Sequence, residues 1–244
     1  MSPVPGLAIA RRFNGPPGSA NGGYACGRLA ALAHTAGHLD GCAAVTLHLP
    51  VPLDSPLTYQ VSGRRGHAWH GDDLVASVTE SGVGLPAPPP VGWAEARESE
   101  AAFDGTGHPF PGCFVCGTER PLDGMGLRPG RVAGSPGTVA CTWTPAPDLA
   151  DEEGRIRAEF VWSALDCPGG WTTDPVRRPR VLGRMTAAVG ELPLAGTPLV
   201  LVGRLERLDG RTATIGTALY DRTDGQPLAV ASSVWVALDG AAPG

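Results

Sequence analysis

Two short segments, far apart in the sequence, contain residue types suited to acid–base chemistry. Asn21, Gly22 and Gly23 precede an alanine- and leucine-rich run, where Asn is a good helix N-cap and free backbone amides gather at the helix start. The same residues are also typical of a simple turn. Asp166 lies in the apolar run FVWSALDCPGGW, where a desolvated carboxylate has a raised pKa and suits a general base. If Pro168 ends that helix, Asp166 is instead a cap for the next segment of the chain.

Cysteine and histidine spacing bears on whether the chain has a metal site. Cys113 and Cys116 have the spacing of a zinc knuckle, but a structural zinc ion needs four ligands and no second pair follows in the sequence. His34 and His38 share a predicted helix face, yet the Glu that a zinc peptidase motif requires does not follow His34. His108 stands in a proline-rich stretch that is typical of a linker. We therefore predict no metal ion.

Length and composition favour a folded protein of two units. The 244 residues are 42% hydrophobic and 18% charged, and they would form two domains of common size. A net charge of −5 argues against nucleic acid as a partner. No apolar run is long enough to span a membrane, and the N-terminus lacks a signal-peptide pattern, so we expect a cytoplasmic protein that does not bind membranes. The six cysteines lack a secreted-protein framework and are expected to be reduced.

A proline-rich linker over residues 84–112, with room for one short helix, separates an N-terminal half (1–83) from a C-terminal half (113–244). Each half predicts one helix followed by four strands, and the C-terminal half has an additional strand before its helix. In the N-terminal half the segment from Asn21 to His34 is predicted to be helical once past its glycines, and the strands span 43–49, 57–62, 66–70 and 74–79. In the C-terminal half a strand at 138–143 and a helix at 159–165 precede strands at 181–189, 199–205, 212–219 and 228–238.

An internal match indicates duplication. PLDSPLTYQV at residues 52–61 aligns, with a one-residue gap, with PLAGTPLVLV at residues 193–202. A helix followed by antiparallel strands must bury itself on one face of its sheet, which gives a two-layer α+β unit. Two such units joined edge to edge would cover exposed sheet edges. The result is one continuous curved sheet that carries two helices.

This order of elements, together with HPFPGCFVCG, GMGLRPG, VWSALDCPGGW and LAVASSVW, resembles the hotdog-fold acyl-CoA thioesterases over most of the chain. One branch is the acyl-CoA thioesterase II type, in which two hotdogs share a chain. The other is the phenylacetic acid degradation type, in which single hotdogs pair. The resemblance implies a tandem double hotdog, each half a long helix on an antiparallel sheet. It also implies a site between the units, built from helix-start amides of one and a carboxylate of the other.

The two halves are complementary in this comparison. Gly22 and Gly23 provide the amides, but Ala30 stands eight residues after Gly22, where the carboxylate is expected. Asp166 provides the carboxylate, but Ala158 stands eight residues before it, where glycine is expected. The resemblance therefore implies one composite site made of the two glycines and Asp166. The mirror site would pair Ala158 with Ala30, and it therefore has neither the helix-start glycine nor the carboxylate.

The resemblance also has departures and leaves alternatives. The threonine and glutamine that position water in the acyl-CoA thioesterase II type correspond to Gly183 and Trp235. An arginine cluster at 177, 178, 180 and 184 suits coenzyme A phosphates or is solvated loop charge. The residues expected to contact substrate are Asn21, Tyr24, Trp162, Trp235 and Arg184.

The implied activity is hydrolysis of an acyl-CoA thioester at the interface of the halves, with Asp166 as general base or nucleophile. Coenzyme A enters only as part of the substrate, and no cofactor is expected. Two alternatives stay open, namely a non-catalytic acyl-CoA-binding or sensing protein and a hotdog dehydratase. A homodimer through sheet or helix faces is compatible with each of them.

Overall fold

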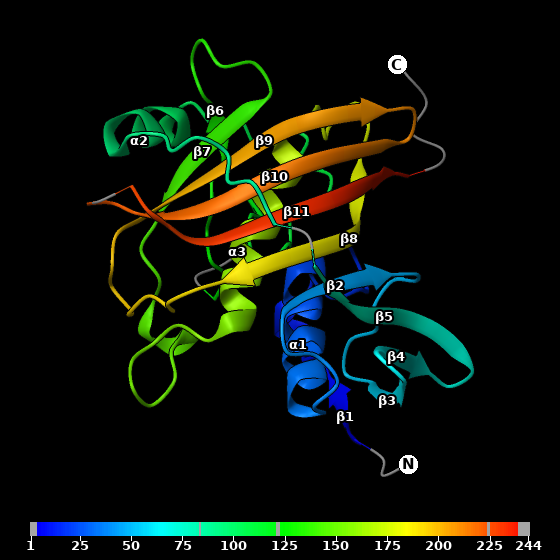
Figure 1. Cartoon of the computed structure of the whole chain (residues 1–244). Coiled ribbons are helices and arrows are strands. Elements are labelled where there is room, and N and C mark those ends of the chain that lie inside the picture. The colour runs from blue at the N-terminus through cyan, green and yellow to red at the C-terminus, as the bar shows by residue number, and fades with distance from the viewer. Residues whose placement is uncertain (1–3, 83, 121–122, 224, 239–244) are drawn as a thin grey trace.

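The computed structural model describes residues 4–82, 84–120, 123–223 and 225–238 (Figure 1). Two short 3-10 helices lie at Arg11–Phe13 and Pro147–Leu149. The other elements follow the chain in the order β1 (Val4–Ala8), α1 (Gly22–Thr35), β2 (Cys42–Leu47), β3 (Pro56–Ser62), β4 (Arg65–His70), β5 (Asp73–Ser81), α2 (Trp93–Ala101), β6 (Gly130–Arg131), β7 (Thr138–Trp143), α3 (Ala158–Trp171), β8 (Arg180–Val189), β9 (Leu199–Asp209), β10 (Thr212–Asp221) and β11 (Pro227–Ala237).

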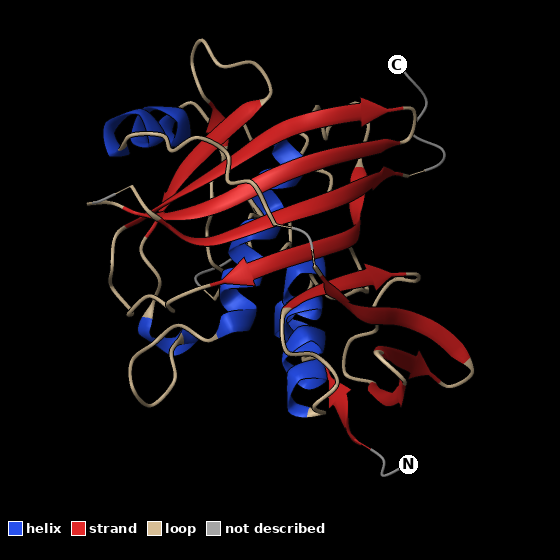
Figure 2. Cartoon of the chain, in the orientation of Figure 1, coloured by secondary structure: helices blue, strands red, loops and turns tan. Residues whose placement is uncertain are grey.

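All the strands of the described residues form one antiparallel sheet with the order β1-β3-β4-β5-β2-β8-β11-β10-β9-β7-β6 (Figure 2). The two halves of the chain meet where β2 pairs with β8, through Ala43 opposite Ala187 and Thr46 opposite Arg184. Outward from this joint, β2, β5, β4, β3 and β1 follow the same order as β8, β11, β10, β9 and β7. The internal sequence match therefore aligns β3 with β9, which hold equivalent places. The predicted edge-to-edge sheet is confirmed.

The two long helices lie side by side on one face of the sheet, behind it in Figure 1. Each has 14 residues, so that Gly22 and Ala158 are equivalent first residues, in agreement with the spacing in the sequence. The Asn21 side chain caps α1 by accepting a hydrogen bond from the Tyr24 amide. In α3, every residue from 160 to 169 is buried, because the helix packs against α1 on one side and against the sheet on another. The helix continues past Pro168 to Trp171, so Pro168 does not end it.

Glycines let α1 and α3 approach closely. A Cβ atom at Gly23 would lie 2.5 Å from the Asp166 Cβ and 2.5 Å from the Trp162 carbonyl oxygen. One turn later, a Cβ at Gly27 would lie 2.7 Å from the Glu159 Cα. Because the later α1 residue, Gly27, faces an earlier α3 residue than Gly23 does, the two helices are antiparallel. Their backbones touch only because two α1 positions carry no side chain.

The linker crosses the opposite face of the sheet, in front of it in Figure 1. Helix α2 packs on β6 and β7, where Ala96 joins a small cluster with Val202 and Tyr220. The Tyr220 hydroxyl donates to the Pro88 carbonyl, and the Thr142 amide donates to Glu100 at 3.2 Å. The expected short helix thus fixes the linker to the C-terminal half. The predicted boundary at residue 83 and the two chain ends lie outside the described residues.

The main core lies between the two long helices and the sheet. The helices and strands predicted from sequence are all present. Most ends differ by one or two residues, but α3 continues to residue 171 and β9 to residue 209, beyond their predicted ends at 165 and 205. The strands β1 and β6 were not predicted, because one is short and proline-containing and the other has two residues. Within the described residues, no helix has the length and apolar character that a membrane span needs.

Candidate functional site

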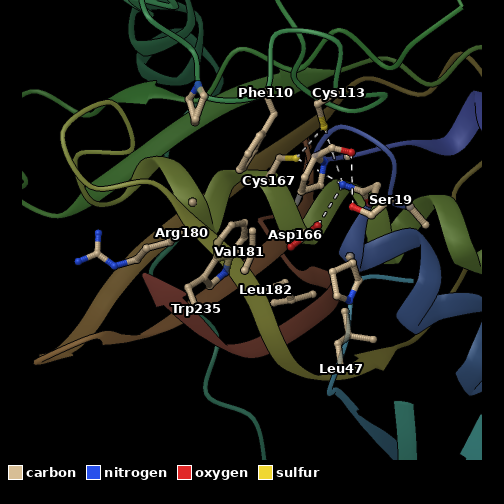
Figure 3. A pocket seen from close by; sticks show the side chains of 18 of the residues that line it. Ser19, Leu47, Phe110, Cys113, Asp166, Cys167, Arg180, Val181, Leu182 and Trp235 are labelled. Atoms are coloured by element: carbon tan, nitrogen blue, oxygen red, sulfur yellow. Dashed lines mark hydrogen bonds between the residues drawn. The ribbon is translucent and has the colours of Figure 1, made fainter. Parts of the chain in front are cut away.

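A pocket with a volume of about 440 Å³ opens where the start of α1, the middle of α3 and the strands β8 and β11 meet. The loop that contains His108 and Cys113 forms another wall. Figure 3 shows Asp166 inside it, beneath the sulfur atoms of Cys113 and Cys167, with Leu182 and Trp235 lining the same cavity. The volume is in the range of small-molecule sites. The pocket therefore contains elements from both halves of the chain.

The Asp166 carboxylate is held across the helix contact by the N-terminal half. Its Oδ2 atom accepts hydrogen bonds from the Gly23 amide at 2.8 Å and from the Asn21 Nδ2 at 3.1 Å. Its Oδ1 atom is buried and has no hydrogen-bond partner among the described residues. The predicted combination of glycines and acid is therefore assembled in space. One carboxylate oxygen is thus fixed by two donors, while the other is buried without a partner in the part of the chain that the structure describes.

Burial dominates the electrostatics of Asp166. Its side chain is only 2% exposed, and this burial raises its pKa to about 7. A negative charge on Cys113 raises the pKa further, whereas the hydrogen bonds from Gly23 and Asn21 lower it. Both the charged and the neutral carboxyl group are consequently accessible near neutral pH, which is the property expected of a general base.

The backbone amides of Gly22 and Gly23 differ in their hydrogen bonding. The Gly23 amide is engaged with Asp166, so it is not a free donor for a substrate oxygen. The Gly22 amide has no hydrogen-bond partner in the described part of the chain, and Gly22 lines the pocket. It also lies at the N-terminus of α1, where the helix dipole favours negative charge. The geometry leaves Gly22 as the free amide at this helix start.

The predicted substrate contacts fall into two groups. Asn21 and Trp235 line the pocket, and Trp235 packs against Gly169 and Gly170 on α3. Tyr24 and Trp162 are buried in the core and do not line it. Tyr24 is instead stacked on Phe13 at a ring distance of 4.1 Å, and Trp162 packs against the contact between α1 and α3.

Arg184 does not line the pocket either, because of an irregularity in β8. The pairing of β8 with β11 shifts between Leu182 and Arg184, which makes Gly183 an extra, bulged residue. Beyond the bulge, Met185 is buried toward the helices and Arg184 is exposed. Regular alternation would have put Arg184 on the same face as Leu182. The only sequence signal for the bulge is a glycine in the strand.

Arg180 lines the pocket in place of Arg184. It is 6% exposed, and its Nη1 donates to the Thr173 hydroxyl at 3.0 Å. Its Nε atom is buried with no partner among the described residues, and burial lowers its pKa. Figure 3 shows the guanidinium on the side of the pocket away from Asp166. A ligand with an anionic end therefore has a cation available at a distance from the carboxylate.

Three buried cysteines also meet at the pocket wall. The Sγ atoms of Cys113 and Cys167 are 3.8 Å apart, and Cys116 completes a group whose sulfurs all lie within 4.8 Å of one another. The His108 Nε2 lies 3.3 Å from the Cys116 sulfur. Hydrogen bonds from the Cys116 and Cys167 thiols lower the pKa of Cys113 well below its usual value. Cys113 and Cys116 could be recognised as a pair from their spacing, whereas nothing in the sequence pointed to Cys167.

Comparison with known proteins gives the fold. No family model matches the chain, and no curated protein matches it. The solved structure of the tesB protein of Mycobacterium avium subs paratuberculosis has a TM-score of 0.60 and 13% sequence identity, covering 91% of this chain and 89% of that chain. The chain has a double hotdog fold. The fold class predicted from the sequence resemblance is thereby confirmed.

Two shorter structures match part of the double hotdog. The E. coli PaaI protein from the phenylacetic acid degradation operon has a TM-score of 0.40 and 12% identity, covering 43% of this chain and 75% of its own. A Streptococcus mutans protein bound to acetyl CoA has a TM-score of 0.40 and 15% identity, covering 44% of this chain and 86% of its own.

Proposed function

We propose that this double hotdog protein is an acyl-CoA thioesterase with one active site, at the pocket where α1 meets α3. The observation that carries the proposal is the Asp166 carboxylate, which the other half of the chain holds through Asn21 and Gly23 while its second oxygen has no partner among the described residues. The equivalent position in α1 is Ala30, so the mirror site has no carboxylate. One site per chain follows from this asymmetry.

The chemistry that suits this geometry is water activation. The Asp166 Oδ1 takes a proton from water, and the hydroxide oxygen attacks the thioester carbonyl carbon. Negative charge then develops on the carbonyl oxygen, where the Gly22 amide and the N-terminus of α1 stabilise it. The C–S bond breaks, the thiolate of coenzyme A takes up the proton that Asp166 removed from water, and the acyl group leaves as a carboxylic acid that loses its proton to solvent. Base catalysis of this kind contributes about 10²–10⁴-fold.

The pocket walls suggest how acyl-CoA would lie. With the carbonyl at Gly22, the acyl chain would pack on the apolar side chains of Leu182 and Trp235. Arg180 would pair with a phosphate group, because a guanidinium matches phosphate oxygens. No threonine or glutamine side chain lines the wall at Gly183 and Trp235, so Asp166 itself has to position the water.

The experiment measures thiol release from acyl-CoAs of graded chain length by the wild type, Asp166→Asn and the matched control Asp209→Asn, which changes an exposed residue at the end of β9. We expect wild-type turnover that falls about 10²–10⁴-fold in Asp166→Asn and stays unchanged in Asp209→Asn. Equal turnover by Asp166→Asn and the wild type would contradict the role of Asp166. Tight acyl-CoA binding without wild-type turnover would contradict the enzyme and favour a sensor.

Labelled water separates the two roles of Asp166. A general base gives single-turnover product with the label only in the released carboxylate. A nucleophile forms an acyl-aspartyl anhydride, and water that attacks the aspartyl carbon of this intermediate puts the label into the aspartate. Label found by mass spectrometry in the peptide containing Asp166, after one turnover in labelled water, therefore demonstrates a nucleophile. Because the carboxylate is fixed by Asn21 and Gly23, we expect no label in the peptide.

A further inference from the structure

Three cysteine sulfurs converge beside the pocket from two distant segments. Cys113 and Cys116 come from the loop after the linker, whereas Cys167 comes from α3, 51 residues later in the sequence. All three side chains are buried, and their sulfur atoms lie within 4.8 Å of one another. The remaining three cysteines of the chain are not part of the group. The fold therefore completes a cluster that the sequence shows only as a pair.

The loop is shaped to present its two sulfurs together. Cys113 and Cys116 line the pocket, while Phe114 and Val115 between them are buried in the main core. The turn closes with the Gly117 amide donating to the Cys113 carbonyl at 2.9 Å. A Cβ atom at Gly117 would lie 2.5 Å from that carbonyl oxygen, so glycine is required where the turn closes. This arrangement resembles a metal-binding knuckle in its backbone and not only in its spacing.

Polar hydrogens point at the sulfur atoms. The Asn21 Nδ2 lies 3.7 Å from the Cys167 sulfur and 4.0 Å from the Cys113 sulfur. The His108 Nδ1 accepts a hydrogen bond from the Phe110 amide at 2.9 Å, so its proton is on Nε2, which donates to Cys116 at 3.3 Å. Such donors stabilise thiolates that bind a metal ion. Because Nε2 carries the proton, His108 is a donor to a ligand and not itself a ligand.

We propose that Cys113, Cys116 and Cys167 bind one zinc ion, whose fourth coordination position opens into the pocket. Zinc–sulfur bonds of about 2.3 Å in tetrahedral geometry place sulfurs about 3.8 Å apart. The Cys113 and Cys167 sulfurs are separated by 3.8 Å. On binding, the three thiols release their protons to solvent, and the hydrated ion gives up all its waters except one at the fourth position. The sequence-based prediction of no metal ion rested on the spacing of neighbouring cysteines, which gives no indication that Cys167 lies beside Cys113 and Cys116.

The ion would join two walls of the pocket. It links the loop at Cys116 to α3 at Cys167, next to Asp166, and it contacts the sulfurs toward which the Asn21 amide points. Asn21 is also a hydrogen-bond donor to Asp166. The metal site would thus restrain Asn21, which in turn donates to the Asp166 carboxylate. Binding is measured without substrate, so this proposal and the proposed hydrolase activity can fail separately.

The test is a metal titration of the reduced full-length protein. Elemental analysis should find one zinc per chain, and cobalt should give one equivalent of a thiolate-to-metal charge-transfer band with tetrahedral d–d bands. Cys113→Ser, Cys116→Ser and Cys167→Ser should each lose stoichiometric binding, whereas Cys26→Ala, which changes an equally buried cysteine outside the cluster, should retain it. Far-ultraviolet circular dichroism before metal addition shows that each variant is folded.

His108→Gln addresses the coordination number. We expect one metal ion and an unchanged charge-transfer band, with affinity lowered about 10–100-fold because a supporting donor is altered. A change in the visible cobalt spectrum of this variant would make His108 a ligand and contradict the open fourth position. Failure of the reduced wild type to bind cobalt or zinc, with all thiols free by chemical titration, would overturn the metal site. A Cys113–Cys167 disulfide that resists reduction in the native protein would overturn it too.

Discussion

Gly23→Ala tests the helix contact that positions the carboxylate. The new Cβ would lie 2.5 Å from the Asp166 Cβ and 2.5 Å from the Trp162 carbonyl oxygen, neither of which can rotate away. Ordinary contact starts at 3.4 Å, so α1 and α3 must separate by about 0.9 Å. The hydrogen bond from the Gly23 amide to Asp166, now 2.8 Å, would then lengthen to about 3.7 Å and be lost.

Three effects set the cost of this substitution. Overpacking costs about 1–3 kcal/mol, and loss of a hydrogen bond to a charged group about 1.5–3 kcal/mol. Alanine regains about 1 kcal/mol of helix propensity. We therefore expect the free energy of unfolding to fall by about 3 kcal/mol and the melting temperature by about 6–12 °C. Thioester hydrolysis should fall about 100-fold, because a displacement near 1 Å of a catalytic group has that effect.

The matched control is Gly27→Ala, one turn away in the same contact. Its Cβ would lie 2.7 Å from the Glu159 Cα, and the next nearest atoms, at 3.0 Å, belong to Trp162. Differential scanning fluorimetry should show a smaller loss of stability in Gly27→Ala, about 1 kcal/mol, because this variant has the overpacking and the gain in helix propensity but keeps the hydrogen bond to Asp166. Thiol release should also fall much less in Gly27→Ala. Wild-type stability and turnover in Gly23→Ala, or equal turnover in both variants, would refute the reasoning.

Three further variants probe the pocket. Asn21→Ala removes the N-cap of α1 and one donor to Asp166, so we expect a loss of about 1 kcal/mol in thermal unfolding and reduced turnover, whereas Asn21→Ser should restore the stability alone. Trp235→Phe should shift the acyl-CoA preference measured by kcat/KM toward bulkier acyl groups, since the indole forms a wall; an unchanged preference would place the acyl group elsewhere. Arg180→Gln should raise KM at least about tenfold and Arg184→Gln less, because only Arg180 lines the pocket; the reverse order would restore the sequence prediction.

The elements and the composite site were accessible from sequence because local signals carry them. Asn21 before a helix-forming run marks the start of α1, and the spacing of Gly22 to Ala30 matches that of Ala158 to Asp166. These signals depend on residue type and order. The pairing of glycines from one helix with the acid of the other could therefore be anticipated before any distance was known.

The remaining details depend on distances that residue order does not encode. The Gly23 amide bonds directly to Asp166 because α1 and α3 nearly touch, which leaves Gly22 as the free amide. The bulge at Gly183 turns Arg184 outward. Cys167 reaches the Cys113 loop only through the path of the chain between them. Each of these is a tertiary contact between segments far apart in sequence.

A crystal structure of Asp166→Asn with an uncleaved acyl-CoA would test the proposed active site most directly. We predict that the thioester lies in the pocket between α1 and α3, with its carbonyl oxygen accepting a hydrogen bond from the Gly22 amide. A water molecule should bridge the carbonyl carbon and the side chain at position 166. A thioester bound outside this pocket, or one whose carbonyl faces away from both Gly22 and residue 166, would contradict the proposed site.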